Sequence, residues 1–199
     1  MSAPGPVFGL VLAGGRSRRF GREKAAAELH GRTLLEASLA TLGPACARLA
    51  IGAPEGGFAA RLAEERGLPR LADAPDHPDG PLSGVHSGLV WAAAEGAALL
   101  ATVPCDTPLL PPDLVERLAA GLGPRSAMAV RTPEGLHPLC AVWRTDLAEP
   151  LARLLADGHP RAADALRALG GGEVVFSDEQ AFYNVNRPAD LAAAERSLG

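Results

Sequence analysis

A short apolar run that ends in a glycine-rich, basic loop lies near the start of the chain and restricts the folds open to it. Residues 7–25 read VFGLVLAGGRSRRFGREKA, and residues 7–12 are β-favouring without polar alternation, which predicts a strand buried on both faces of a parallel sheet. Gly14 and Gly15 end the run and let main-chain N–H groups approach a ligand closely. The surrounding turn carries five basic residues: Arg16, Arg18, Arg19, Arg22 and Lys24. Together these features predict a site for an anionic, phosphate-bearing ligand.

Two common phosphate-binding loops do not fit this stretch. The P-loop requires Gly-Lys followed by Ser or Thr, whereas Arg22 and Glu23 separate Gly21 from Lys24 and no hydroxyl follows. The dinucleotide fingerprint requires G-x-G-x-x-G at the start of a helix, whereas a basic run separates Gly15 from the next glycine. A basic surface turn after an edge strand is the simpler alternative, which the ordered Gly, Ser, Arg and Lys positions disfavour. The loop is therefore interpreted as a nucleotide-binding loop of another type.

Strand and helix patterns alternate after this loop. β-favouring runs predict strands over residues 47–53, 68–72 and 98–105, and apolar stripes predict helices over residues 33–42, 58–66 and 82–95. A further helix begins at Pro111 and Pro112, and residues 126–143 read as two strands suited to antiparallel pairing. The remaining predicted elements are helices at 147–155 and 162–169, a strand at 173–176 and a terminal helix that reaches Leu198. The pattern predicts an α/β protein: a three-layer, mostly parallel Rossmann-like sheet with an antiparallel excursion in the C-terminal half.

A carboxylate follows the most apolar stretch of the chain. Residues 98–105 are almost wholly apolar, and Asp106 comes directly after them. Ligands of open α/β sheets bind beyond the carboxyl ends of the strands, so Asp106 and the loop that ends at Lys24 should emerge on one edge. Alone, an aspartate in this place more often caps a turn. Combined with the basic loop, it predicts a site for a metal ion and a triphosphate.

Two other segments hold candidate binding residues for which more than one role stays open. The loop over residues 73–84 leads into a helix, and Gly80 and Gly84 flank its start. Exposed N–H groups there could receive a base or a ribose, and an ordinary turn with a helix cap is an equal alternative. Near the C-terminus, Asn184 and Asn186 alternate along an extended segment and can face the same ligand. For Asn186, a helix N-cap is at least as good an interpretation.

Composition narrows the class of protein. The 199 residues suffice for one α/β domain with a substantial core, and a net charge of -4 argues against a general nucleic-acid binder. Cys46, Cys105 and Cys140 form no disulfide framework and the histidines lack zinc-site spacing, so we expect buried cysteines in a reducing compartment. The start of the chain lacks signal-peptide features, and no apolar stretch approaches the ~20 residues that span a bilayer. The expected protein is cytoplasmic and binds neither membrane nor nucleic acid.

Five ordered motifs carry a resemblance that covers nearly the whole chain. They read LAGGRSRRFGREK, DAPDHPDGPLSG, VPCDTPLLPPDL, HPLCAVW and FYNVNRPADL. In this order they resemble the molybdenum cofactor guanylyltransferase family, which has the GTA-like nucleotidyltransferase fold. The resemblance implies Mg²⁺-dependent transfer of GMP from GTP to the terminal phosphate of a molybdopterin-type molybdenum cofactor, with release of pyrophosphate. It also implies transient contact with cofactor-delivering proteins or molybdoenzymes.

The same resemblance implies a role for individual residues. The nucleotide would be bound by Leu12, Ala13, Gly14, Gly15, Lys24, Asp73, Gly80, Gly84 and Asp106. Asp106 would hold Mg²⁺, while Arg19 and Lys24 would stabilise the leaving pyrophosphate. Asn184 and Asn186 would face the pterin acceptor. Within a single nucleotidyltransferase domain over residues 1–199, residues 1–110 would mainly bind nucleotide and metal, and residues 111–199 the acceptor.

Departures and alternatives accompany this interpretation. Glu23 stands where the family usually has Asp before the loop lysine, and residues 51–54 offer no polar nucleotide contact. A cytidylyltransferase acting on the same cofactor would share the loop and Asp106, although GPLSG favours the guanylyl branch. A sugar-phosphate nucleotidyltransferase usually carries a Pro-Lys pair in its first loop, which is absent here. A non-catalytic carrier of GTP or cofactor would bind its ligand without releasing pyrophosphate.

Overall fold

Seven strands build the central sheet in the computed structural model, which describes residues 5–14, 23–74, 80–158, 160–187 and 189–192. The strands are β1 (Val7–Leu12), β4 (Arg48–Gly52), β5 (Arg70–Leu71), β6 (Leu99–Pro104), β7 (Ala127–Thr132), β8 (Gly135–Arg144) and β9 (Gly172–Val175). Their order is β5-β4-β1-β6-β8-β7-β9. The first four are parallel, β8 is antiparallel to both β6 and β7, and β9 is parallel to β7. The predicted mostly parallel sheet with a C-terminal antiparallel excursion is confirmed.

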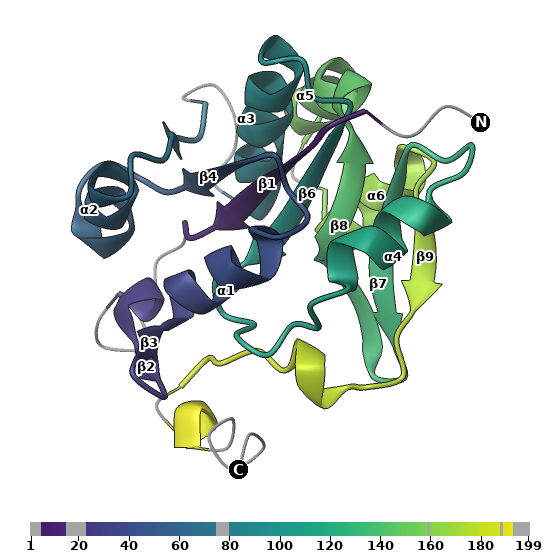
Figure 1. The fold of residues 1–199 in the computed structure, drawn as a ribbon. Coiled ribbons are helices and arrows are strands. Elements are labelled where there is room, and N and C mark those ends of the chain that lie inside the picture. The colour runs from purple at the N-terminus through teal and green to yellow at the C-terminus, as the bar shows by residue number, and fades with distance from the viewer. Residues whose placement is uncertain (1–4, 15–22, 75–79, 159, 188, 193–199) are drawn as a thin grey trace.

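Helices cover both faces of this sheet (Figure 1). They are α1 (Leu34–Leu42), α2 (Gly57–Glu65), α3 (Pro81–Ala94), α4 (Leu114–Gly121), α5 (Ala148–Ala156) and α6 (Ala162–Ala168). Apolar side chains of α1, α2 and α4 pack on one face, and those of α3, α5 and α6 on the other. Successive side chains of a strand point to opposite faces, so Val11 of β1 joins the first layer while Leu10 and Leu12 join the second. The predicted three layers are confirmed.

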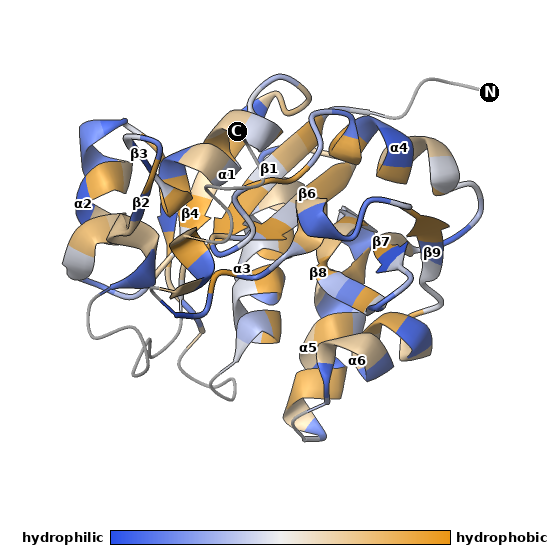
Figure 2. Cartoon of the chain, turned by 90° about the horizontal axis from the view of Figure 1, so that it is seen from below, coloured by the Kyte–Doolittle hydropathy of each residue, from blue (hydrophilic) through white to orange (hydrophobic). Residues whose placement is uncertain are grey.

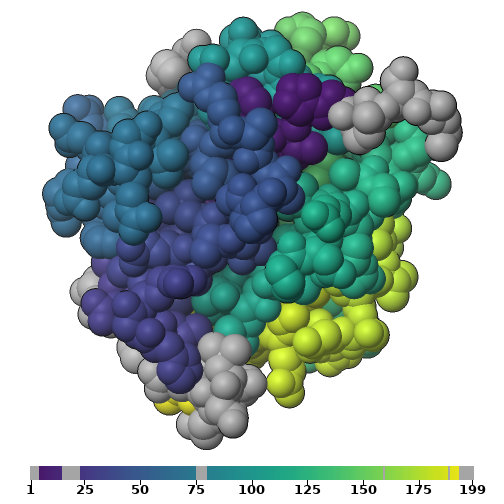
Figure 3. All heavy atoms as spheres, in the orientation of Figure 1, coloured from purple at the N-terminus to yellow at the C-terminus, as the bar shows by residue number. Residues whose placement is uncertain are grey.

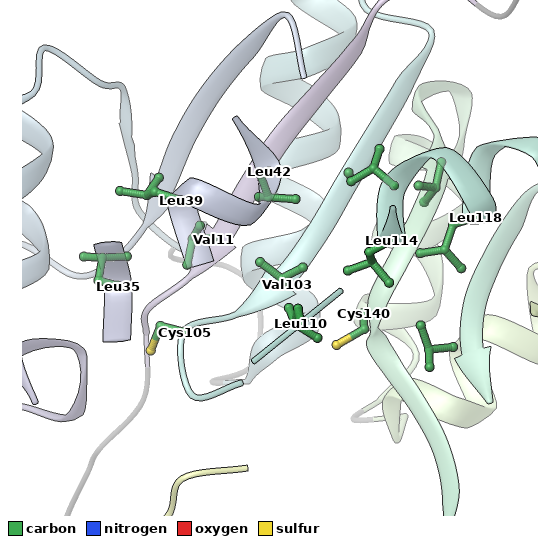
Figure 4. Close-up of a cluster of buried hydrophobic side chains, with 14 of the residues drawn as sticks. Val11, Leu35, Leu39, Leu42, Val103, Cys105, Leu110, Leu114, Leu118 and Cys140 are labelled. Carbon is green, nitrogen blue, oxygen red and sulfur yellow. The ribbon is translucent and has the colours of Figure 1, made fainter. Parts of the chain in front are cut away.

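Burial of leucines from two helices fixes the first layer. Leu35 and Leu39 of α1 pack beside Val11, and Leu114 and Leu118 of α4 continue the same cluster (Figure 4). In Figure 3 the atoms of α1 (blue) and α4 (teal) cover this face of the sheet. Figure 2 shows apolar residues gathered along the central strands and hydrophilic residues on outward sides of the helices. Both faces of the central strands are therefore buried, as their continuous apolar runs predict.

The second layer contains a close contact and a buried polar pair. A Cβ atom at Gly88 of α3 would lie 2.5 Å from Cδ2 of Leu10, so a glycine lets the helix lie this close to β1. Between β6 and β8, the buried Trp143 Nε1–H donates to Thr102 Oγ1 at 3.0 Å. The Thr102 hydroxyl in turn donates to the Leu139 carbonyl oxygen at 2.8 Å. These bonds satisfy the polar atoms of the Trp143 and Thr102 side chains.

Most predicted elements are confirmed with small changes at their ends. Helix α1 begins after Thr33, whose side chain and main chain form a capping box with Glu36. Strand β5 contains only two residues, fewer than the five predicted. A hairpin of β2 (Glu28–Leu29) and β3 (Arg32–Thr33) was not predicted, because its turn relies on left-handed φ angles of 49° and 73° at His30 and Gly31. Of the predicted terminal helix, residues 189–192 are helical and the rest lies outside the described residues.

Candidate active site

The carboxyl ends of β1, β4 and β6 meet at one edge of the sheet. The main-chain N–H of Ala13 donates to Gly52 O at 2.8 Å, and that of Cys105 donates to Leu12 O at 3.1 Å. The Leu12 side chain itself is buried in the second layer. Ala13 and Gly14 therefore leave the sheet beside the carboxyl ends of β4 and β6, the two strands that flank β1, as expected of an open α/β fold.

Lys24, Asp106 and Asn186 come together at this edge. The Lys24 ammonium donates to Asp106 Oδ2 at 2.9 Å and to Asn186 Oδ1 at 2.8 Å. The side chains of Lys24 and Asp106 are 16% and 21% exposed, so the pair is mostly shielded from water yet open to a ligand. Three of the predicted site residues, from the first loop, the end of β6 and the C-terminal segment, thus form one contact.

The C-terminal segment is held against this edge by its main chain and by apolar side chains. Val185 donates its N–H to the Asp106 carbonyl oxygen at 2.8 Å. Its buried side chain joins Ala27, Leu29 and Leu34 in a small cluster of its own. In Figure 1 the segment (yellow) runs past the ends of the central strands to β2 and β3. The unpredicted hairpin thus supplies, through Leu29, part of the apolar surface against which the segment packs.

The two asparagines behave as their alternation predicts. Asn184 and Asn186 are exposed and Val185 between them is buried. The side chain of Asn186 receives the Lys24 hydrogen bond, while Asp190 accepts the main-chain N–H groups of Asn186 and Arg187 at 2.7 and 2.8 Å. These bonds hold the pKa of Asp190 below its ordinary value, with the bond from Asn186 as the largest cause. The side-chain contact to Lys24 thus favours a place for Asn186 in the site.

The start of α3 lies next to the first strand. A Cβ atom at Gly84 would lie 2.9 Å from Leu12 Cδ2 and 3.6 Å from Asp73 Oδ1. Gly84 therefore has a packing role, and the Asp73 carboxylate lies beside the first turn of α3. Gly80 is the N-cap residue of the helix, and no heavy atom of the described residues lies within 4 Å of a Cβ built there. The predicted contacts of Asp73, Gly80 and Gly84 with the nucleotide remain predictions.

Two predicted residues, Gly15 and Arg19, lie outside the described residues. Their assigned roles therefore also remain predictions. Lys24 has one further property that sequence reasoning missed: it is the only lysine in a chain whose 19 Lys and Arg residues otherwise consist of arginine. A composition that uses arginine everywhere else points to a need for an ammonium group at this position. This count is the signal that could have singled out Lys24 directly.

The cysteines near the site do not provide a nucleophile. All three cysteines are free, and Cys105 and Cys140 are buried close to Asp106. Burial, with the Asp106 charge as a smaller cause, raises the pKa of both thiols to about 12. A thiol with such a pKa stays protonated at neutral pH and is a poor nucleophile. The prediction that the cysteines are buried in the core is confirmed for Cys105 and Cys140, whereas Cys46 is only partly buried and packs against the first layer.

Two other side chains near this edge also went unassigned from the sequence. Glu23 accepts hydrogen bonds from the first turn of α2, from the N–H groups of Phe58 and Ala59. His137 lies near the start of β8, with its Nε2 3.1 Å from Thr132 Oγ1, and its ring packs at a tilt against the Phe182 ring with 5.3 Å between centroids. Their sequence positions, beside Lys24 and within HPLCAVW, are the signal that could have identified them.

Within the described parts of the chain, no group of three or more His, Cys, Asp or Glu side chains is placed to hold a metal ion. None of the described helices is long and apolar enough to cross a membrane. The edge is thus a site with one carboxylate, one ammonium and one carboxamide in direct contact.

Comparison with known proteins gives a consistent family. The MobA-like NTP transferase domain family matches residues 9–173. A molybdenum cofactor guanylyltransferase of Cereibacter sphaeroides is 48% identical over 195 residues, which are 96% of this chain and 97% of that protein. A protein of the same name from Acidiphilium cryptum is 40% identical over 190 residues, 94% of this chain and 92% of its own length.

Solved structures agree at the level of the fold. Molybdopterin-guanine dinucleotide biosynthesis protein A from Archaeoglobus fulgidus superimposes with a TM-score of 0.77 at 23% identity, over 96% of this chain and 98% of that one. A 4-diphosphocytidyl-2C-methyl-D-erythritol synthase gives a TM-score of 0.75 at 16% identity, with complete coverage of both chains, 100% and 100%. The predicted GTA-like nucleotidyltransferase fold is confirmed.

Proposed function

This chain belongs to the MobA-like NTP transferases, and within them to the molybdenum cofactor guanylyltransferases, and we propose that it forms a guanine dinucleotide cofactor by GMP transfer. The donor is GTP, the acceptor is the terminal phosphate of a molybdopterin-type molybdenum cofactor, and the second product is pyrophosphate. The observation that supports this function best is the contact of Lys24 with Asp106 and Asn186. It joins the loop suited to phosphates to the segment proposed for the acceptor.

The chemistry requires two polyanions to meet. An acceptor phosphate oxygen attacks the α-phosphorus of GTP, and negative charge grows on the departing pyrophosphate. Lys24 supplies positive charge at the carboxyl edge, and a preorganised charge of this kind stabilises the transition state more than the ground state. No covalent intermediate is needed, since the acceptor oxygen is already ionised. We propose the same task for Arg19.

A divalent cation fits the residues at this edge. Mg²⁺ is usually bound by one or two carboxylates together with substrate phosphates and water, rather than by a full set of protein ligands. Asp106 offers such a carboxylate, 21% exposed, at the end of β6. We therefore propose Asp106 as the residue that holds Mg²⁺, which when bound would neutralise and orient the triphosphate. Lys24, which contacts Asp106 at 2.9 Å, would then turn to the phosphate oxygens.

The remaining site residues divide between the two substrates. We propose that Ala13, Gly14 and Gly15 offer main-chain groups to the nucleotide, with the Leu12 main chain, and that Asp73, Gly80 and Gly84 serve its guanosine end. Asn184 and Asn186, exposed on one side of the C-terminal segment, are proposed to face the pterin. Residues 1–110 would then mainly bind nucleotide and metal, and residues 111–199 the acceptor. The three free cysteines suit the proposed cytoplasmic setting.

One experiment tests donor, acceptor and reaction together. Purified protein is incubated with Mg²⁺, molybdopterin cofactor and either GTP or CTP, and both pyrophosphate and dinucleotide product are measured. Product from GTP alone supports the proposal. Product from CTP alone would move the protein to the cytidylyl branch with the same site, and GTP binding without pyrophosphate release would make it a carrier. Omission of Mg²⁺, with EDTA present, tests the metal requirement in the same assay.

A further inference from the structure

The Glu23 carboxylate binds the N-terminus of α2. Its oxygens accept hydrogen bonds from the N–H of Phe58 and, at 2.9 Å, from the N–H of Ala59. These first-turn N–H groups have no acceptor within the helix and carry the positive end of its dipole, so a carboxylate there is favourable. The N-cap residue, Gly56, has no side chain to fill this role. Glu23 fills it from 35 residues before Phe58.

The α2 side of this contact leaves room for the carboxylate. Gly57 has a φ of +76°, and a Cβ atom there would lie 2.6 Å from Glu23 Oε2. Any other residue at position 57 would be strained and would collide with the carboxylate. The contact thus depends on a matched pair, an acid at position 23 and a glycine at position 57.

This contact immediately precedes the lysine of the site. Glu23 is the N-cap residue of the 3₁₀ helix η1 (Lys24–Ala26), and the N–H of Ala26 donates to its carbonyl oxygen at 3.1 Å. Ala25, which directly follows Lys24, is only 1% exposed and packs in the first apolar layer. The main chain of Lys24 is therefore fixed on one side by a docked carboxylate and on the other by a buried side chain.

We propose that Glu23 is a positioning residue for GMP transfer: by tying the end of the first loop to α2, it sets the place from which Lys24 reaches the phosphates. The inference rests on the proposed function. Asp106 contacts the Lys24 ammonium directly, whereas Glu23 acts through the backbone that carries it. Because a displacement of ~1 Å can lower a rate about 10²-fold, Glu23→Ala is expected to reduce kcat by ~10- to 100-fold. Glu23→Gln keeps one acceptor oxygen and should fall between this variant and the unaltered protein.

A double-mutant cycle separates positioning from general stability. If Glu23 acts by placing Lys24, then Glu23→Ala should lower the residual kcat of a Lys24→Ala protein by no more than about 2- to 3-fold. Glu36→Ala is the matched control, because the Glu36 carboxylate also accepts a main-chain N–H at the start of a helix, that of Thr33 before α1. It should lower the melting temperature to a similar extent and leave kcat unchanged. A Glu23→Ala protein that is folded and has a normal kcat would overturn the inference. The same holds if Glu23→Ala lowers kcat by the same factor whether Lys24 is present or replaced by alanine.

The single lysine provides a second readout that needs no activity. Trace acylation with acetic anhydride, followed by peptide mapping, reports the reactivity of Lys24 against that of the terminal amine. In the unaltered protein Lys24 is 16% exposed and bonded to Asp106, so slow labelling is expected. Glu23→Ala should raise its labelling rate several-fold, and Glu36→Ala should not; unchanged labelling in Glu23→Ala counts against positioning. Since labelling does not depend on turnover, a protein that forms no dinucleotide refutes the proposed function while this result still decides the role of Glu23.

Discussion

Truncation of Lys24 is expected to disable GMP transfer far more than it destabilises the fold. The substitution Lys24→Ala removes the ammonium that bonds Asp106 Oδ2 at 2.9 Å and Asn186 Oδ1 at 2.8 Å. Loss of one preorganised electrostatic group typically lowers kcat by ~10²–10³, which is about 2.7–4 kcal/mol of transition-state stabilisation. The Asp106 side chain is 21% exposed, so water can solvate it after truncation. We therefore expect the free energy of unfolding to fall by only ~1–2 kcal/mol.

The two effects are measured separately. Turnover is followed by pyrophosphate release with GTP, Mg²⁺ and molybdopterin cofactor, and stability by thermal denaturation, where the expected shift is roughly 2–8 °C for a domain of this size. Lys24→Arg keeps the charge, but a planar guanidinium does not place one nitrogen between two acceptors from different segments, so at least a ~10-fold loss of kcat remains. Near-normal kcat and GTP affinity in Lys24→Ala would refute the role assigned to this residue. An activity loss that matched only the fraction of unfolded protein would refute it equally.

Three further changes test the surroundings of the site. Thr102→Val leaves the buried Trp143 N–H without its acceptor and should lower the free energy of unfolding, measured by urea denaturation, by ~1–3 kcal/mol. The KM for GTP should not change. Gly88→Ala places a methyl 2.5 Å from a leucine of β1 and should lower the free energy of unfolding by about 1–3 kcal/mol. Gly135→Ala, where no atom in the described part of the chain lies within 4 Å, should lower it by under ~1 kcal/mol. Burial lowers the pKa of His137 below 6.5, so the folded protein binds this proton less readily than the unfolded chain. Stability should thus fall as the pH drops below 6.5, and urea titrations between about pH 7 and 5 should show a weaker decline in His137→Gln.

Much of the fold could be predicted from local patterns. The apolar run of β1 has no polar residue to face water, so its burial on both sides followed from composition alone. The position of Asp106 at the end of a second buried run followed in the same way, and the rule that ligands bind at the carboxyl edge brought it near the first loop. The hairpin of β2 and β3 was missed because a His-Gly pair is a weak signal for its turn.

The candidate site was less predictable, because one residue type can satisfy several hydrogen-bonding roles. From the sequence, Asn186 could cap a helix or face a ligand. In the structure the carboxamide oxygen of Asn186 accepts a hydrogen bond from Lys24, 162 residues away, while Asp190 accepts from the main-chain N–H groups of Asn186 and Arg187. The choice depends on the burial of Val185, which brings the C-terminal segment against Ala27, Leu29 and Leu34.

The class of fold, the basic loop with its one lysine and the carboxylate at the end of β6 can all be inferred from the amino-acid sequence, because they depend on short-range periodicity and on residue chemistry. Which of these groups come into contact depends on the tertiary packing. The pairing of Lys24 with Asp106 and Asn186, and the docking of Glu23 on α2, join segments that local propensity leaves independent. Their contacts follow from strand order and from the burial of apolar side chains between distant elements, which is a property of the whole packed chain.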